Sequence, residues 1–240
     1  MSKKKSNNST KQRLLQQAGV AFAEKGFHAA GIREICDKAG ANVSAVNYYF
    51  GDKEKLYEAV IKHAFDYALE KYPLLGKASE DASPEELLYE FILSLLSRRL
   101  DANRPAWHRT LLWREIDDPS SACREILKNI KNIHYQKLLN IMKKMVSPEL
   151  DDDCIHFCMA SIVGQVMFYQ REKFDVGPMD RFVDYSPEGL ETLARHICNF
   201  SISAVRNMYA GNGADKKNKS KNDGTSRRTN RKKAGKTRKA

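Results

Sequence analysis

The chain has 240 residues, of which 42% are hydrophobic and 30% are charged, and its formal net charge is +11. This length allows a small domain of roughly 50 residues beside one of roughly 150 residues with its own buried core. Because no stretch of about 18 apolar residues occurs, we expect no membrane span, no secretory signal and a cytoplasmic location.

Four helices are predicted in the first third of the chain, where apolar residues recur every three or four positions. They cover residues 9–25, 32–39, 43–49 and 53–72. Ser9, Asn42 and Asp52 are placed to cap the first, third and fourth of these helices. Gly26 and Gly40 are placed to end the first two.

Five further helices are predicted in the rest of the chain, four of them from an N-cap residue followed by proline. These start signals are Ser83-Pro84, Asp118-Pro119, Ser147-Pro148 and Ser186-Pro187. A shorter helix over residues 105–116 fits between the first two, and residues 175–180 are expected to form an exposed loop. Since no segment alternates with the period of a strand, we predict an all-α fold of about nine helices.

The excess of positive charge lies in the last residues of the chain. Residues 210–240 contain 12 Lys and Arg and 2 Asp and Glu, whereas the remaining 209 residues carry 29 basic and 28 acidic side chains. This tail has no aromatic or large aliphatic residue, so it cannot bury enough surface to offset its chain entropy. We expect it to be disordered, and either to increase solubility or to attract phosphates regardless of sequence.

Two short helices joined by a glycine-containing turn predict a helix-turn-helix motif over residues 32–49. In that motif the first residues of the second helix meet the base edges in the major groove. Val43, Ser44 and Ala45 lie there, and their small side chains allow a close approach to the bases. Arg33, on the preceding helix, is long enough to reach a base. The donors placed for phosphate contacts are Asn47, Tyr48, Tyr49 and Lys53.

The run YYFGDKEKLY at residues 48–57 is the most distinctive sequence in the chain. Together with Gly-Phe at 26–27 and Ile-Arg-Glu-Ile at 32–35, it resembles the DNA-binding domain of the TetR/AcrR family of transcriptional regulators. The sequences Arg-Glu at 114–115 and Ser-Ile-Val-Gly-Gln at 161–165 resemble the CecR-type C-terminal domain. Two positions depart from the family pattern, because Gly31 stands where Thr or Ser is usual and Asn47 where Tyr is frequent.

The resemblance implies a one-component regulator, most simply a repressor that a small molecule releases from a palindromic DNA operator. Its first three helices and the start of the fourth would bind DNA, while the remaining helices would hold the effector and form a homodimer through the last two. The domains expected are a flexible N-terminus at 1–9, a three-helix DNA-binding domain at 10–56, an effector and dimerisation domain at 57–209 and the tail at 210–240. Side chains that could line the effector pocket are Trp107, Trp113, Arg114, His134, Met159, Gln165 and Tyr169.

Other kinds of function compete with this one. A metal site at Cys154, His156 and Cys158 is disfavoured, because on a helix the second residue points about 160° away from the other two. With no metalloprotease motif, glycine-rich phosphate loop or nucleophile elbow, we expect neither an enzyme nor a bound metal or cofactor. The remaining alternative is a non-specific architectural DNA-binding protein driven by the basic tail.

Overall fold

The computed structural model describes residues 2–79, 81–101, 103–148, 150–169 and 184–210, and these residues form nine helices and no strand, as predicted. The helices are α1 (Ser2–Ala29), α2 (Ile32–Ala39), α3 (Val43–Tyr49), α4 (Lys53–Lys71), α5 (Pro84–Leu100), α6 (Ala106–Asp117), α7 (Arg124–Met145), α8 (Asp152–Phe168) and α9 (Pro187–Ala210). The loop predicted at 175–180, and the predicted tail beyond Ala210, lie outside the described residues.

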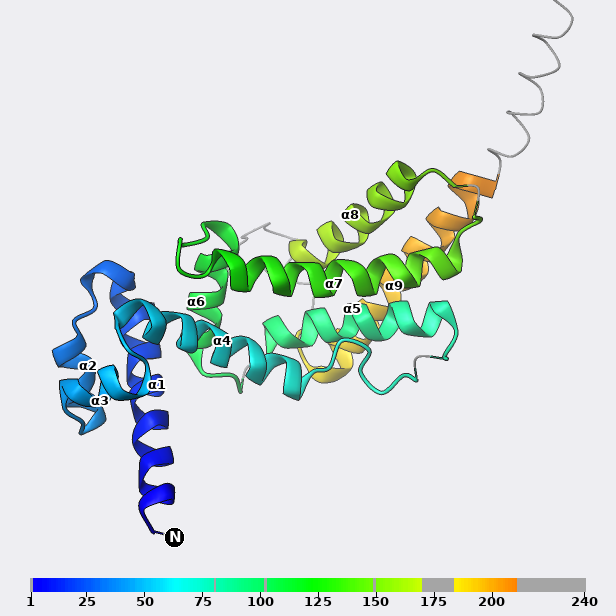
Figure 1. Cartoon of the computed structure of the whole chain (residues 1–240). Coiled ribbons are helices and arrows are strands. Elements are labelled where there is room, and N and C mark those ends of the chain that lie inside the picture. The colour runs from blue at the N-terminus through cyan, green and yellow to red at the C-terminus, as the bar shows by residue number, and fades with distance from the viewer. Residues whose placement is uncertain (1, 80, 102, 149, 170–183, 211–240) are drawn as a thin grey trace, which may run out of the picture.

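The molecule is elongated, with a small lobe at one end and a helical bundle at the other (Figure 1). We call α1, α2 and α3 the head, and α5, α7, α8 and α9 the bundle. Helix α4 leads from the head to the bundle, and α6 packs against both α1 and α4. Among the described residues, no helix has the length and apolar character needed to cross a lipid bilayer.

Two separate clusters of buried apolar side chains hold these parts together. The head core joins α1, α2, α3 and α4 to α6 and the start of α7, with Phe22, Tyr57 and Leu111 at most 1% exposed. The bundle core joins α5, α8 and α9 to the C-terminal half of α7, with Leu88, Phe91 and Ile162 equally buried. The head core therefore contains α6, although more than 50 residues of sequence separate this helix from α3.

The short helices of the head follow the local signals closely, but the first helix begins earlier than predicted. Helix α1 extends back to Ser2 rather than starting at Ser9, because residues 2–9 contain no proline or glycine to interrupt it. It therefore covers residues that we expected to be flexible. The backbone of Gly26, at φ 80° and ψ 170°, breaks the regular helix at the predicted place, and one further turn continues to Ala29.

Two of the four proline start signals in the second part of the chain are correct. The hydroxyls of Ser83 and Ser186 accept hydrogen bonds from the backbone N–H groups of Glu86 and Gly189, at 3.2 and 3.1 Å, and so begin α5 and α9.

The other two signals, Asp118-Pro119 and Ser147-Pro148, are wrong. Helix α7 begins only at Arg124, because the buried carboxylate of Glu115 accepts hydrogen bonds from the N–H and hydroxyl of Ser120 and holds a turn there. Helix α8 begins at Asp152, where Asp151 provides the cap.

The apolar spacing along α4 predicts an inner face made of Leu56, Ala59, Val60, His63 and Tyr67, and the structure buries a different set. Leu56 and Val60 are buried as expected, but His63 is exposed. Tyr57, Ile61, Ala64 and Ala68 are buried in its place. Because α4 packs against both α1 and α6, it buries a wider stripe than one amphipathic face would require.

Candidate nucleic-acid interface

The turn between α2 and α3 is fixed by local hydrogen bonds. Gly40 adopts the left-handed conformation at φ 60°, and its N–H donates to Asp37 O while that of Ala41 donates to Cys36 O. From α1, Arg13 Nε donates to Ala39 O at 2.9 Å. The C-terminal end of α2 is therefore anchored to the body of the head.

Helix α3 is held by one buried side chain and presents its opposite face to solvent. Asn42 caps it, accepting from Ala45 N at 3.0 Å, and Val46 is 1% exposed in the head core. Val43 is 41% exposed and Tyr48 is 76% exposed. Ser44 and Asn47 are also exposed, whereas Ala45 and Tyr49 are half-buried. Because positions 43, 44, 47 and 48 lie on one side of a helix, we call them the outer face of α3.

The outer face carries side chains of the kinds that can contact DNA. Its first residues are small, and its later residues carry an amide and a phenol, which can bond to phosphates or base edges. Ser44 donates its hydroxyl proton to Asn42 Oδ1 at 2.6 Å, so its hydroxyl oxygen keeps acceptor capacity towards a base. All three residues predicted to meet base edges thus lie at the leading end of α3, and none is buried.

The neighbouring α2 carries a small ion-pair network. Glu34 is bound by Lys25 of α1 at 2.6 Å and by Lys38 at 3.0 Å, and these two lysines lower the pKa of its carboxyl group. Arg33 lies beside this network on α2, is exposed and has no hydrogen bond or ion pair within the described part of the chain. Its guanidinium is therefore available for a base or a phosphate.

Lys53 has an internal contact that the sequence did not suggest. It is the first residue of α4, and its Nζ donates to His28 O at 3.1 Å and lies 5.1 Å from the centre of the Phe27 ring. This ammonium ties the start of α4 to the end of α1. An ammonium has three N–H groups, so the contact leaves donors for the predicted phosphate contact.

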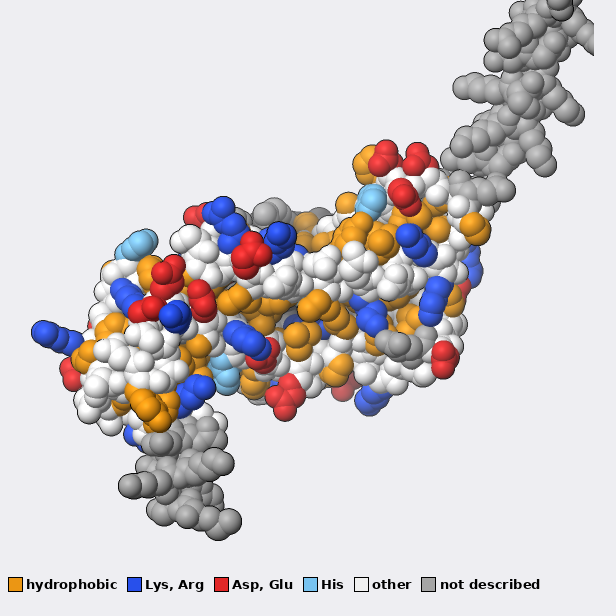
Figure 2. All heavy atoms as spheres, in the orientation of Figure 1, with side chains coloured by type: hydrophobic (Ala, Val, Ile, Leu, Met, Phe, Trp, Pro, Cys, Tyr) orange, Lys and Arg blue, Asp and Glu red, His pale blue; other side chains and the backbone are white. Residues whose placement is uncertain are grey.

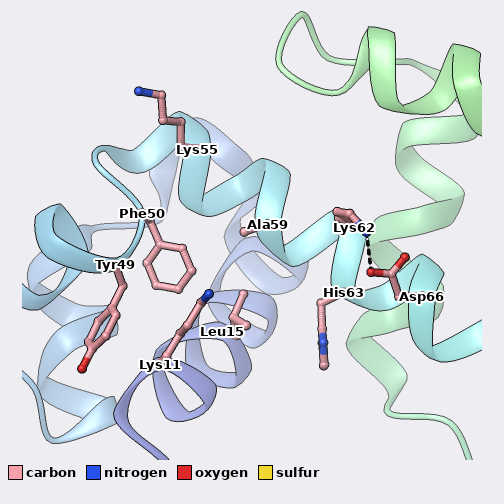
Figure 3. Close-up of a pocket in the computed structure, with 9 residues that line it drawn as sticks. All are labelled: Lys11, Leu15, Tyr49, Phe50, Lys55, Ala59, Lys62, His63 and Asp66. Atoms are coloured by element: carbon pink, nitrogen blue, oxygen red, sulfur yellow. Dashed lines mark hydrogen bonds and ion pairs between the residues drawn. The ribbon is translucent and has the colours of Figure 1, made fainter. Parts of the chain in front are cut away.

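A shallow hollow of about 360 Å³ lies behind the outer face, between α1 and α4 (Figure 3). Phe50 and Leu15 are among the residues that line it, and Lys11 Nζ lies 5.9 Å from the centre of the Phe50 ring. The hydroxyl of Tyr49 points away from this hollow, whereas the aromatic ring of Phe50 lies between α1 and α4 (Figure 3). Phe50 is thus part of the packing of the head.

Polar contacts that were not predicted from the sequence attach α6 to the head. The Tyr57 hydroxyl donates to Glu115 Oε1 at 2.6 Å in a buried hydrogen bond, and burial raises the pKa of this phenol. Arg114 donates from its guanidinium to Phe22 O at 2.9 Å and to Ala23 O at 3.2 Å. The partners in these hydrogen bonds lie 58 to 92 residues apart in sequence. Local sequence patterns therefore do not show that they meet.

The side chains predicted to line an effector pocket lie in different surroundings. Trp107 packs in the head core against Gly19, and Arg114 binds the backbone of α1. His134 contacts Arg98 on the bundle side, and Met159 is buried in the bundle core. Gln165 Nε2 donates to Ser201 Oγ at 3.4 Å, Tyr169 packs at the edge of the bundle core, and Trp113 is 36% exposed. Trp107 thus belongs to the head core and Met159 and Tyr169 to the bundle core, so the structure does not join these side chains in one group.

The potential metal ligands of α8, Cys154, His156 and Cys158, do not form a metal site. His156 hydrogen-bonds to the Tyr135 hydroxyl of α7, and their rings stack at 5.8 Å between centres. Within the described residues, no three His, Cys, Asp or Glu side chains are close enough together to hold a metal ion.

Two family models match the chain, one on each part. Residues 14–60 match the bacterial regulatory proteins of the tetR family, and residues 84–205 match the C-terminal domain of the HTH-type transcriptional dual regulator CecR.

Known proteins give the same assignment. The chain is 28% identical over 122 residues to the probable HTH-type transcriptional regulator YttP of Bacillus subtilis. The matched segment covers 50% of this chain and 56% of that protein. The chain is 40% identical over 62 residues to CecR of Shigella flexneri, 26% of this chain and 27% of that protein. The matched segments thus span about half or less of these relatives.

The fold has solved counterparts. The crystal structure of PfmR, a TetR family transcriptional regulator of Thermus thermophilus, matches with a TM-score of 0.55 over 80% of this chain and 97% of that one, at 20% identity. The family and the curated relatives are transcriptional regulators rather than enzymes. The helix-turn-helix with its exposed α3 and the helical bundle agree with the matches to both domains. The chain therefore belongs to the TetR family of DNA-binding transcription regulators, with a C-terminal domain of the CecR type.

Proposed function

We propose that the protein binds a palindromic DNA operator as a homodimer and releases it when a small-molecule effector binds. The observation that carries the DNA part is the outer face of α3, which is exposed beside Arg33 and anchored from behind by Val46. In this arrangement α3 enters the major groove, with Val43, Ser44 and Ala45 at the base edges. Arg33 reaches a base from α2.

The contacts to the DNA backbone surround this reading surface. Asn47, Tyr48 and Tyr49 follow the base-reading residues along α3, and Lys53 stands at the first turn of α4. There the positive end of the helix dipole adds to its ammonium in favouring a phosphate. These four side chains set the position of the head on the duplex, while the residues at the start of α3 select the sequence.

The bundle supplies a surface suited to a second copy of the chain. Phe157, Ala160, Ser161, Gly164 and Phe168 are all exposed and share one side of α8. Phe157 is 68% exposed, and Phe200 of the neighbouring α9 is 61% exposed. Hydrophobic side chains are visible at the surface in the region of α8 (Figure 2). A Cβ added to Gly164 would meet no atom within 4 Å, so a helix of a partner has room to approach closely.

A two-fold dimer through this surface fixes the distance between two heads, which is what a palindromic operator requires. We propose the division of labour accordingly, with DNA binding in residues 10–56 and effector binding and dimerisation in residues 57–209. Helix α6 belongs to the second part by sequence but is bonded to α1 and α4. A shift of α6 would therefore move the head.

An effector can release DNA only if it binds the DNA-incompetent dimer more tightly than the competent one. The side chains predicted for the pocket lie on α6, α7 and α8, except Tyr169, which directly follows α8. These are the helices that such a molecule would displace. Repression relieved by the effector follows if the operator overlaps a promoter.

Selection of bound DNA from a random-sequence pool, with the purified full-length protein, tests this function. We expect an enriched inverted repeat whose half-sites lie about 10 base pairs or a multiple apart. The variant Phe157→Glu should be monomeric by sedimentation and should lose the repeat. The matched change Tyr185→Glu, at an exposed aromatic residue just before α9, should keep both. Binding without sequence preference, or a wild-type monomer, would contradict the proposed function.

A further inference from the structure

The start of α6 gathers buried polar groups that the head and the bundle do not satisfy. Arg104 is 6% exposed, Trp107 is 5% exposed and His108 is 1% exposed. Their atoms Arg104 Nε, Trp107 Nε1 and His108 Nδ1 are the buried side-chain atoms that lack a hydrogen-bond partner in the described part of the chain. We call these three residues and the adjacent Arg98 the cationic centre. Three unsatisfied groups within five residues are a concentration that native cores normally avoid.

The two guanidinium groups of the centre are bound by neutral acceptors. Arg98, 7% exposed, donates to Tyr72 O at 2.8 Å and to Ser94 Oγ at 2.7 Å, and its Nη1 contacts His134 Nε2 at 2.6 Å. Arg104 donates to Arg98 O at 2.9 Å and to Ala64 O at 2.7 Å. Neither arginine forms an ion pair with a carboxylate in the described residues. Burial lowers the pKa of each to about 10, so both remain charged at neutral pH.

The carboxylate that acts on Arg104 is already occupied. Asp101 is 7% exposed, and its carboxylate accepts from Lys71 Nζ at 2.6 Å and from Asn103 N at 3.0 Å. Its charge acts on Arg104 only from a distance. Three cationic side chains thus share one carboxylate, and a buried positive charge without a paired anion is unfavourable unless something else supplies the negative charge.

The surroundings are aromatic and offer further donors. The ring centre of His108 lies 5.1 Å from that of Tyr67 and 4.0 Å from that of Trp107. Burial, followed by the charges of Arg104 and His63, lowers the pKa of His108 to about 3, so its ring is neutral. Helix α6 also begins without a side-chain cap, so the positive end of its dipole adds to the two guanidinium groups.

From these contacts we infer that the cationic centre binds an organic anion, whose carboxylate is held by Arg98 and Arg104 and whose apolar body packs against Trp107 and Tyr67. Buried arginines match the two oxygens of a carboxylate, and the indole N–H and the His108 ring offer additional hydrogen bonds. The centre lies where α4, α5 and α6 meet, so the anion would bind at the junction between the bundle and the helices packed on the head. This assignment rests on the proposed function, because it identifies the chemical class of the effector.

Thermal unfolding of the full-length protein without DNA tests the site directly. The probes are benzoate, octanoate, the neutral isostere benzamide, inorganic phosphate and sodium chloride of equal ionic strength. We expect benzoate or octanoate to raise the Tm saturably, by about 3 to 6 °C at roughly ten times its Kd, and the other three to have no comparable effect. No response to either organic acid, or an equal response to benzamide or phosphate, would overturn the inference.

Variants separate this site from ordinary surface binding. Arg104→Gln should weaken the organic acid roughly tenfold or more, because it removes a charge-assisted contact. Trp107→Phe keeps the ring against Gly19 but removes the indole N–H, so it should weaken binding less and serves if Arg104→Gln does not fold. Arg124→Gln, at the exposed start of α7, is the matched control and should leave binding unchanged. Unchanged binding in Trp107→Phe and Arg104→Gln alike would place the anion elsewhere.

The regulatory function and the anion site can be contradicted separately. If the protein selects no operator but binds benzoate in this way, the cationic centre stands and the regulatory function is wrong. If it selects an operator and none of the acids binds, the function stands and the anion site is wrong.

Discussion

The head core and the bundle core contain similar apolar side chains but differ in their polar contents. The bundle core is an apolar cluster, although the bundle also buries Ser94 and Arg98 on α5 and Ser201 on α9. The head core instead encloses the hydrogen bond from Tyr57 to Glu115. Apolar packing tolerates small shifts, whereas buried polar groups demand particular partners. The hydrogen bond from Tyr57 to Glu115 therefore specifies the orientation of α6 on the head.

Leu111→Ala has the largest expected effect on this comparison. Leu111 is fully buried in the head core, so the cavity should cost about 2 to 5 kcal/mol of unfolding free energy. Both tryptophans of the chain lie on α6, so urea unfolding followed by tryptophan fluorescence reports on this core. Ile92→Ala makes a similar cavity in the bundle core. Because Leu111 packs in the head core, Leu111→Ala should also weaken operator binding by the folded protein. If only Ile92→Ala weakened operator binding, α6 would not belong to the head as we describe.

Tyr57→Phe removes the polar link while keeping the ring. The expected loss is about 1.5 to 3 kcal/mol, because a buried carboxylate loses a hydrogen bond while keeping those from Ser120. The same urea titration measures it. Tyr48→Phe, at a hydroxyl on an exposed side chain, should change stability by at most about 0.5 kcal/mol. Equal effects of the two changes would mean that the buried hydrogen bond adds no stability to the head core.

Sequence and structure agree best where the signal is local. The bounds of α2 and α3 and the caps at Asn42 and Asp52 were predicted, because each depends on residues within one turn. The start signal at Asp118 failed because Glu115, itself fixed by Tyr57, organises the turn that follows.

The predicted pocket residues lie apart in the structure for a related reason. Periodicity shows which face of a helix is buried but not which core receives it, so the separation of Trp107 from Met159 was not visible. Arg98 and Arg104 were missed because charged residues are usually exposed, and only the tertiary structure shows these two to be buried.

Arg33→Ala tests the DNA side of the head. It should cost about 1 to 3 kcal/mol of binding free energy or somewhat less, and should relax specificity at one base position. Lys53→Ala should weaken binding to all sequences alike, which competition gel shifts with single-base operator variants would distinguish. A uniform loss from Arg33→Ala would assign that side chain to a phosphate instead.

Gly31→Ser has the smallest expected effect. Gly31 caps α2 without a side-chain hydrogen bond, its φ is −90°, and a Cβ there would meet no atom within 4 Å. A serine should therefore fit and stabilise the head by a few tenths of a kcal/mol. A raised midpoint of the fluorescence transition in urea is the expected result, and a lowered one would show that the start of α2 is more constrained than its geometry suggests.

The role of the outer face of α3 is tested most directly by changing what it selects. Ser44→Arg places a long donor at the leading end of this helix, where a guanidinium pairs best with guanine. Repeating the random-sequence selection with this variant should enrich guanine at one symmetric position in each half-site and leave the spacing unchanged. An unchanged consensus sequence, with binding intact, would mean that another surface reads the DNA.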